Sequence, residues 1–68
     1  MFITVYDLDD IHRTKPKYLN TNKIFLMEIV PTSFVGIRRL NVWFTANTEY
    51  KSYYISEETY LKIPLEVR

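Results

Sequence analysis

Acidic side chains and the only histidine crowd together just after the first apolar run of the chain. Asp7, Asp9, Asp10 and His12 lie within six residues, and carboxylates and imidazole can ligate divalent cations. A calcium loop needs a glycine for its sharp turn, and this segment has none. Aspartates also begin ordinary loops, because their side chains hydrogen-bond to nearby backbone. We therefore predict a loop here, with no metal and no cofactor.

Nucleophilic catalysis finds little support in the sequence. A histidine-based system would have to use His12, which stands in the predicted loop, and the chain has no cysteine. No Gly-x-Ser-x-Gly elbow, phosphate-binding loop or dinucleotide fingerprint accompanies the histidine. We expect a protein that is not an enzyme and that has no catalytic residues.

Basic residues alternate after the acidic cluster, which favours a phosphate backbone as one class of partner. Single-stranded nucleic acids bind to cationic grooves that also offer aromatic rings for base stacking. The net charge of +1 argues against this class, because nucleic-acid-binding domains are usually strongly basic. The same charges would also keep an edge strand from pairing. The residues of this alternative are Arg13, Lys15, Lys17, Tyr18 and Lys23, with Arg38 and Arg39 added from a later segment.

Aromatic residues gather in the second half of the chain. If Val42 faces the core, Trp43 must face the other way, and Tyr53 and Tyr54 cannot both point inward. Trp, Tyr and Arg dominate the binding energy of protein interfaces, so outward rings predict a contact surface. A second cluster under a terminal helix would also account for them. The predicted interface residues are Trp43, Tyr50, Tyr53, Tyr54, Tyr60, Arg38 and Arg39.

A β-hairpin over Leu40 to Ile55 must position these rings. Leu40, Val42, Phe44 and Ala46 alternate with more polar or outward positions, which is typical of a strand buried on one face. The segment Ala46-Asn47-Thr48-Glu49 supplies the reversal, because asparagine tolerates left-handed backbone. We expect Phe44 in the core, so that Phe44→Ala would severely destabilise the protein.

Three more strands are predicted before this hairpin. Phe2 to Leu8 alternates with Ile3 and Val5 on the core side, and a loop over Ile11 to Lys17 follows. Tyr18 to Asn20 is a short strand that ends in the turn signal Asn20-Thr21-Asn22. The segment from Lys23 to Val30 is apolar at every interior position except Glu28. Because both of its faces are apolar, we predict that it is the central strand.

Ser56 begins the one predicted helix. Its hydroxyl is a good N-cap, and Glu57 and Glu58 follow where the helix dipole favours negative charge. Pro64 limits this helix to the span from Glu57 to about Lys62. Leu65 to Val67 is expected to be a tail or an edge strand.

Length and composition set the remaining bounds. The 68 residues predict a single small domain whose stability is marginal, so self-association would help it. Apolar residues make up 47% of the chain, which is too many for a disordered protein. The start, MFITVYDLDD, lacks a basic leader, and no apolar run approaches the roughly 20 residues of a membrane span. Without cysteines, a cytoplasmic location is the default expectation.

The order of motifs resembles that of the FlbD-type small flagellar proteins. The resemblance lies in a first strand, the pair Leu19-Asn20 with Ile24, Pro31, a hairpin that turns at Asn47, and the acidic segment Ser56-Glu57-Glu58. The chain differs by the insertion of Asp9 to Pro16 and by Thr48 where that family prefers glycine. The resemblance implies a β-meander with a terminal helix, and we carry over no flagellar role.

The combined expectation is a mainly β protein. We predict a small antiparallel sheet, or barrel-like meander, of four or five strands with a short C-terminal helix. Its expected function is that of a non-catalytic protein-binding or regulatory module, such as an accessory protein or inhibitor of the kind phages and mobile elements encode. We expect it to act through an exposed aromatic surface or a sheet edge. A protein partner and a homodimer are expected, and nucleic-acid binding is the alternative.

Overall fold

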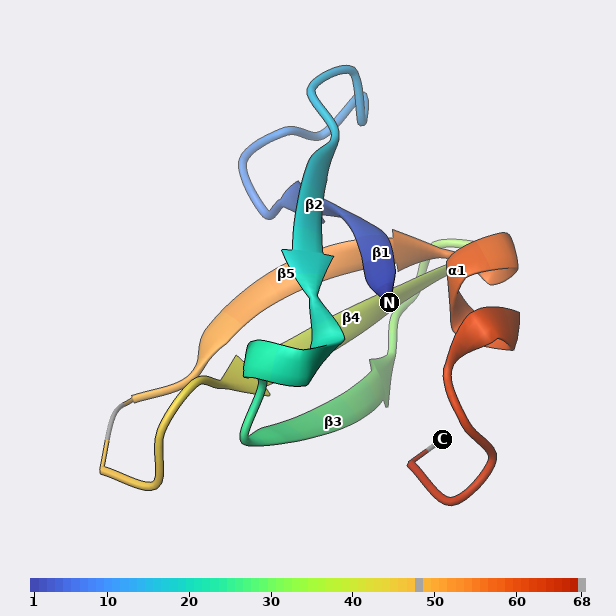
Figure 1. Cartoon of the computed structure of the whole chain (residues 1–68). Helices are drawn as coiled ribbons and strands as arrows, with labels where there is room; N and C mark the ends of the chain where they lie inside the picture. Colours follow the sequence, from blue (N-terminus) through green and yellow to red (C-terminus); the bar gives the residue numbers. More distant parts are fainter. Residues whose placement is uncertain (48, 68) are drawn as a thin grey trace.

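Five antiparallel strands form one open sheet in the order β2-β1-β5-β4-β3 (Figure 1). The computed structural model describes residues 1–47 and 49–67. The strands are β1 (Phe2–Asp7), β2 (Lys17–Asn20), β3 (Leu26–Pro31), β4 (Ile37–Trp43) and β5 (Lys51–Ser56). A 3₁₀-helix, η1 (Thr21–Lys23), links β2 to β3, and the helix α1 (Glu57–Lys62) follows β5. The predicted mainly β fold with a short C-terminal helix is confirmed.

The hairpin of β4 and β5 has the phase that the alternation predicts. Leu40 and Val42 are fully buried and pair with Tyr53 and Lys51 of β5. The prediction for Phe44 is wrong: β4 ends one residue earlier, and the Phe44 side chain is 38% exposed. Residues 44–50 connect the two strands, and Thr48, part of the predicted reversal, lies outside the described residues.

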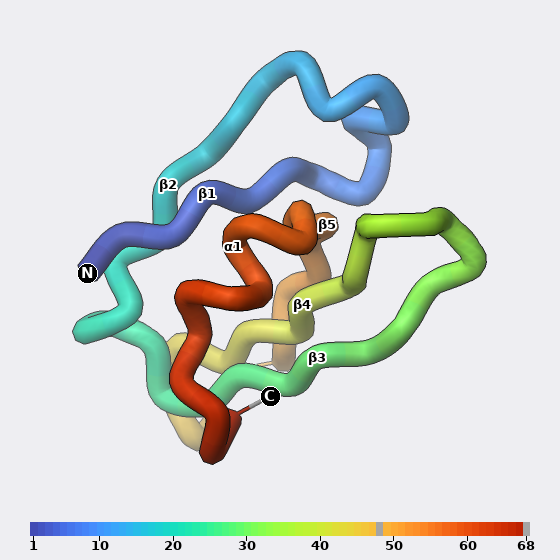
Figure 2. Tube along the Cα trace, turned by 90° about the vertical axis from the view of Figure 1, so that its right-hand side faces the viewer, coloured from blue at the N-terminus to red at the C-terminus, as the bar shows by residue number. Residues whose placement is uncertain are grey.

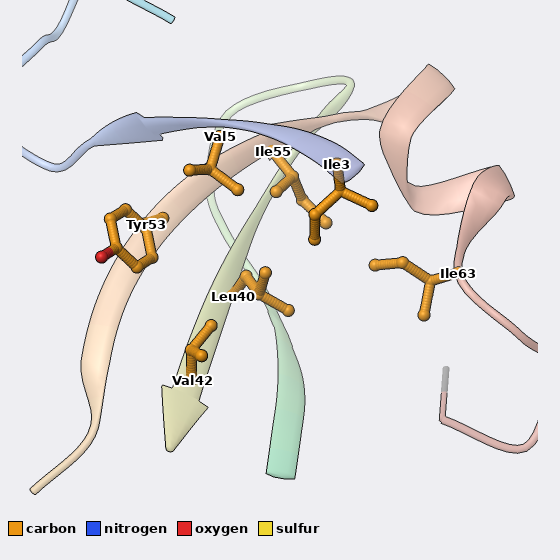
Figure 3. Packing of buried hydrophobic residues seen from close by; sticks show 7 residues of the cluster. All are labelled: Ile3, Val5, Leu40, Val42, Tyr53, Ile55 and Ile63. Carbon is orange, nitrogen blue, oxygen red and sulfur yellow. The ribbon is translucent and has the colours of Figure 1, made fainter. Parts of the chain in front are cut away.

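The hydrophobic core lies on the concave side of the sheet, at the end where α1 packs. Figure 3 shows its side chains converging from β1, β4, β5 and the residue that ends α1. Ile3 and Val5 face this core, as their alternation predicts. Leu19, Ile24, Met27 and other half-buried side chains pack around it. The buried hydrophobic residues are Ile3, Val5, Leu40, Val42, Tyr53, Ile55 and Ile63.

The helix α1 closes one end of the core. Ser56 is its N-cap as predicted, and its hydroxyl oxygen accepts a hydrogen bond from the Thr59 N–H at 3.2 Å. Ile63 ends the helix and is buried, while residues 65–67 form a turn that passes beside the start of β3 (Figure 2). No helix among the described residues has the length and apolar character needed to cross a membrane.

The strand β3 lies at an edge of the sheet, so the prediction of a central strand over Lys23 to Val30 is wrong. β3 begins only at Leu26 and pairs with β4 alone, whereas β5 is the middle strand of the five. Apolar residues on both faces of a strand predict that other elements cover both faces. In the structure Met27 and Ile29 pack against the core, and Leu26 on the opposite face is 51% exposed.

β1 joins the two halves of the sheet over a short distance. It pairs with β2 from Phe2 to Val5, and with β5 only through Tyr6↔Tyr54 and Asp7↔Tyr53. Between these two ladders the sheet bends, so that the β1–β2 pair crosses the meander of β3, β4 and β5 steeply (Figure 1).

A pair of alanine substitutions tests this placement of the core. We expect Leu40→Ala to lower the free energy of unfolding by about 2 to 5 kcal/mol, because it leaves a cavity at a fully buried site. Phe44→Ala should cost about 1 kcal/mol or less, since its ring is partly in solvent outside β4. Urea denaturation followed by Trp43 fluorescence measures both. Equal losses for the two variants would contradict the described end of β4.

Candidate functional site

The convex side of the sheet, opposite the core, is here called the outer face. Alternation sends Arg39, Asn41 and Trp43 of β4 to this side, because Leu40 and Val42 point into the core. Register then places Tyr54 beside Arg39, and Tyr6 beside Tyr54. Val30 lies across from Arg39 on β3. A continuous row of these residues therefore crosses four strands.

Aromatic rings on the outer face contact one another in two pairs. Trp43 packs against Tyr50 with ring centroids 5.0 Å apart and a tilt of 48°. Phe34, from the loop between β3 and β4, meets Tyr54 edge to face at 6.1 Å. Phe34 and Tyr50 are both exposed. Such geometries are favourable for aromatic pairs and fix the rings without burying them.

A chain of polar side chains separates the two ring pairs. Asn41 donates from Nδ2 to Glu28 Oε1 at 3.0 Å, and its Oδ1 accepts from the Ser52 hydroxyl at 2.7 Å. The Ser52 oxygen in turn accepts from Arg39 Nη2 at 3.0 Å. Asn41 is only 7% exposed, so both of its hydrogen bonds are made in a site that largely excludes water. We name Glu28, Asn41, Ser52 and Arg39 the polar ladder.

Arg39 forms the end of the polar ladder at which a hydrogen-bond donor is left unpaired by the described residues. Its Nε is buried and has no hydrogen-bond partner among the described residues. Its Nη2 is held by Ser52, so the planar guanidinium is fixed in position beside Tyr54. A fixed guanidinium presents its donors in the geometry that matches a carboxylate.

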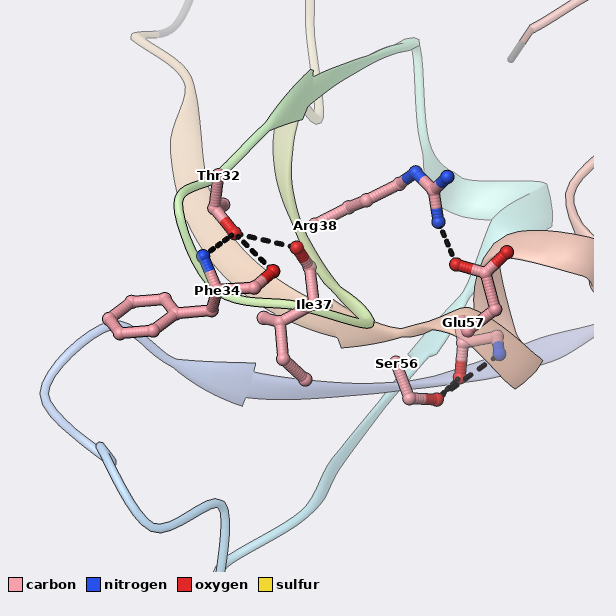
Figure 4. Close-up of polar contacts among 7 residues, drawn as sticks. Thr32, Phe34, Ile37, Arg38, Ser56 and Glu57 are labelled. Atoms are coloured by element: carbon pink, nitrogen blue, oxygen red, sulfur yellow. Dashed lines mark hydrogen bonds and ion pairs between the residues drawn. The ribbon is translucent and has the colours of Figure 1, made fainter.

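The other predicted interface residues lie elsewhere. Tyr53 is 8% exposed and belongs to the core, so the structure removes it from any contact surface. Arg38 points to the opposite side from Arg39, where it forms an ion pair with Glu57 (Figure 4). Its guanidinium carbon also lies 3.7 Å from the centre of the Tyr60 ring. The structure thus keeps Arg39, Trp43, Tyr50 and Tyr54 together and separates Arg38 and Tyr60 from them.

The loop between β3 and β4 is built to present Phe34. The Thr32 hydroxyl accepts from the Phe34 N–H at 3.1 Å and donates to the Ile37 carbonyl at 2.6 Å (Figure 4). Gly36 then adopts a φ of +74°, a conformation that other residues rarely adopt. These contacts fix the turn that carries the Phe34 ring over Tyr54.

Hydrogen bonds and an ion pair from acidic side chains order the predicted basic loop. Asp10 accepts hydrogen bonds from the N–H groups of Thr14 at 3.1 Å and Lys15 at 2.9 Å. Lys17 forms an ion pair with Asp7 at 2.7 Å. Arg13 donates to the carbonyl of Ile11 at 3.2 Å. Asp7 thus pairs with the charge of Lys17, while the hydrogen bonds of Asp10 order the backbone of the loop.

The remaining residues of the nucleic-acid alternative do not extend this loop into one track. Tyr18 is exposed on β2, and Lys23 lies in η1, after the other end of that strand. Arg38 and Arg39 lie on opposite sides of β4.

The acidic cluster lines a groove of about 350 Å³ together with Lys15 and Lys17. Within residues 1–47 and 49–67, no group of three or more His, Asp or Glu side chains is arranged to hold a metal ion. Hydrogen bonds from the backbone of Lys15 and Thr14 lower the pKa of Asp10 below its usual 3.8. The hydrogen bond and charge of Asp7 raise the pKa of Lys17 above its usual 10.5.

Sequence reasoning missed four residues of the two ring pairs and the polar ladder: Glu28, Phe34, Asn41 and Ser52. Their common signal is phase, because Glu28, Asn41 and Ser52 are the outward polar positions of three neighbouring strands. That signal becomes readable only when the pairing register is known. Phe34 lies in a loop, for which alternation predicts nothing.

In comparisons with known proteins, no protein-family model, no curated protein and no solved structure matches this chain. The resemblance to the FlbD-type small flagellar proteins therefore stays a prediction.

Asp10 should make the order of the loop over residues 8–16 depend on pH. A carboxyl whose folded-state pKa is lowered stabilises the fold above its unfolded value of 3.8, and this contribution is lost as the pH falls through the folded value. We expect the amide protons of Thr14 and Lys15 to lose protection, relative to their intrinsic exchange rates at the same pH, as the pH falls below 3.8.

Asp10→Asn should cause this loss of protection already at neutral pH, and Asp9→Asn is the control, because Asp9 is exposed. NMR hydrogen exchange measures all three proteins. Unchanged exchange rates in Asp10→Asn would refute the capping role.

Truncation of the middle residue of the polar ladder should destabilise the protein. Asn41→Ala leaves Glu28 and Ser52 without these partners, and we expect a loss of about 1 to 3 kcal/mol in the free energy of unfolding. Lys51→Ala, at an exposed position on the same hairpin, should change it by about 0.5 kcal/mol or less. Chemical denaturation compares them, and similar small losses in both would show that the ladder adds no stability.

Proposed function

We propose that this protein is a non-catalytic protein-binding module that uses its outer face as the contact surface. The observation that carries the proposal is the arrangement of two fixed ring pairs around Arg39 on one side of the sheet. The binding residues proposed here are Phe34, Arg39, Trp43, Tyr50 and Tyr54.

Residue types and rigidity both support a protein partner. Tyrosine, tryptophan and arginine contribute most of the energy at protein interfaces, and they do so from clusters that exclude water. Binding also costs the entropy of ordering each side chain. Trp43 and Tyr54 are already held by neighbouring rings, and Arg39 by Ser52, so this cost is reduced.

Charge indicates what the partner surface should offer. The Glu28 carboxylate accepts a hydrogen bond from Asn41 at one end of the polar ladder. The guanidinium of Arg39 is the cation at the other end, between the two ring pairs. A guanidinium binds a carboxylate through parallel hydrogen bonds. The complementary surface is therefore apolar, with an Asp or Glu opposite Arg39.

Nucleic acid is the weaker candidate. Lys17 and Arg38 are already paired with Asp7 and Glu57, and the loop around Lys15 is held by Asp10. A phosphate backbone needs cations that can exchange their counterions along a continuous path.

The proposal is tested by capture from extracts of the native host, with the tagged wild-type protein and three variants. Trp43→Ser and Tyr50→Ser should each lose the captured partner, because truncation of an interface hot spot costs about 2 kcal/mol or more, roughly 30-fold in affinity. Leu61→Ser is the matched control, because Leu61 is an exposed apolar residue on α1, away from the outer face. It should retain the partner.

Salt dependence separates the two classes of function. Binding through the outer face should change little between about 50 and 200 mM salt, whereas nucleic-acid binding falls steeply in this range. Capture that is unaffected by both ring variants, or retention on single-stranded DNA that modest salt abolishes, would overturn the proposal.

A further inference from the structure

The two edges of the sheet differ in how well they are protected. β2 is four residues long, follows Pro16, begins with Lys17 and ends at Asn20, whose side chain caps η1. Short length, lysine and proline are the devices that keep edge strands from pairing. β3 is six residues long and apolar except for Glu28, and its proline comes only at the end. β3 is therefore the exposed edge that lacks such protection.

Hydrogen-bond alternation identifies the free backbone groups of β3. The Glu57 N–H donates to the Gly36 carbonyl at 3.1 Å, in register with the pairs of β4 and β5. Alternate residues of an antiparallel strand bond to opposite sides, so Arg39, Asn41 and Trp43 direct their backbone groups to β3. Their partners on β3 are the residues at even positions, Leu26, Glu28 and Val30.

The backbone groups of Met27, Ile29 and Pro31 consequently face away from the sheet. Pro31 has no N–H, and this is the side of an edge strand on which a proline is tolerated. The free edge thus offers the N–H groups of Met27 and Ile29 and the carbonyls of all three residues. These groups form a template for one more antiparallel strand.

We propose that two copies of this chain pair through β3, antiparallel and about a two-fold axis at Ile29. In this register each Ile29 N–H donates to the Ile29 carbonyl of the other copy. Each Met27 N–H donates to the Pro31 carbonyl of the other copy. Because Pro31 has no N–H, the return hydrogen bond is missing, and this loss falls at the two ends of the pairing. The two open sheets become one continuous sheet, and their outer faces lie side by side.

Self-complementarity favours a second copy over an unrelated strand. A two-fold register must match residues of equal phase, because a shift by one residue turns the side chains to the wrong face. Centring on Glu28 would set two carboxylates opposite each other, which is destabilising. Centring on Ile29 puts Glu28 opposite Val30 and packs the two Ile29 side chains together.

In the dimer, the side chains at this edge would also become more buried. Met27 and Ile29 pack against the core but remain only half-buried, so pairing extends each core into the other. A groove of about 360 Å³ lies at the start of this edge, between residues 21–27 and the C-terminal turn at Glu66 and Val67. The net charge of +1 sets little repulsion between two copies. A single strand pair is small for a stable interface, so the dimer should depend on concentration.

Hydrogen exchange on the unmodified protein is the first test. In the monomer the amide protons of Met27 and Ile29 exchange fast, while those of Glu28 and Val30 are protected by β4. As the concentration rises to about 1 mM, exchange at Met27 and Ile29 should slow at least tenfold, in parallel with dimer measured by sedimentation. Fast exchange at both positions in a protein that stays monomeric would overturn the proposal.

Cysteine cross-linking tests the register, because the chain has no cysteine of its own. Opposite residues of a hydrogen-bonded pair lie about 5.5 Å apart, within the range that a disulfide spans. Ile29→Cys should therefore form a disulfide dimer on oxidation. Glu28→Cys should form at least tenfold less, since its counterpart lies on a diagonal, about 7 to 8 Å away.

Tyr18→Cys, at an exposed position on β2, is the control and should stay reduced. Cross-linking stronger at residue 28 than at residue 29, or strongest at residue 18, would refute the Ile29-centred pairing. The proposal does not depend on the function of the outer face. Trp43→Ser should leave the dimer intact, so the failure of one proposal is distinguishable from the failure of the other.

Discussion

Burial of the β1 side chains is the interaction on which the rest of this fold depends. β1 shares only two residue pairs with β5, too short a ladder to hold two halves of a sheet in place by backbone hydrogen bonds. Ile3 and Val5 instead pack against the side chains of β4 and β5, and Ile63 closes the far end (Figure 3). The hydrophobic effect, which is not directional, therefore sets the relative position of elements whose internal geometry is directional.

The outer face is a consequence of this core. A single sheet with one short helix can cover only its concave side, and strict alternation sends every second residue of β4 and β5 to the other side. The chain places aromatic rings and the hydrogen-bonded polar ladder on that side. The ladder satisfies the buried amide of Asn41, and the same hydrogen bonds orient Arg39. If the outer face binds a partner as proposed, the contacts that stabilise the fold also orient the binding residues.

Local patterns were sufficient to predict the parts of the fold that local physics decides. Alternation identified Ile3, Val5, Leu40 and Val42 as core, and capping chemistry identified Ser56. Strand order was beyond such patterns. The apolar faces of β3 are compatible with a central position or with an exposed edge, and only the pairing with β4 decides between them.

The candidate site was predictable in part. Trp43 follows from the phase of β4, whereas the choice between Tyr53 and Tyr54 needs the pairing register of β5. The prediction for Phe44 failed because a strand can end before its pattern does. Ion pairs such as that of Lys17 with Asp7 join residues far apart in the chain, so a run of cations in the sequence says little about free charge in the fold.

The adjacency of β1 and β5 also has a consequence for how the chain reaches its native state. β1 leaves the ribosome before the other four strands, and its neighbour β5 leaves it last. The meander of β3, β4 and β5 is built from pairings close in sequence, which form quickly, whereas docking of β1 closes the longest loop in the protein. Until β5 has been synthesised, β1 can therefore pair only with β2, and Ile3 and Val5 remain without their partners in the core. The step that completes the core is the step that synthesis delays most.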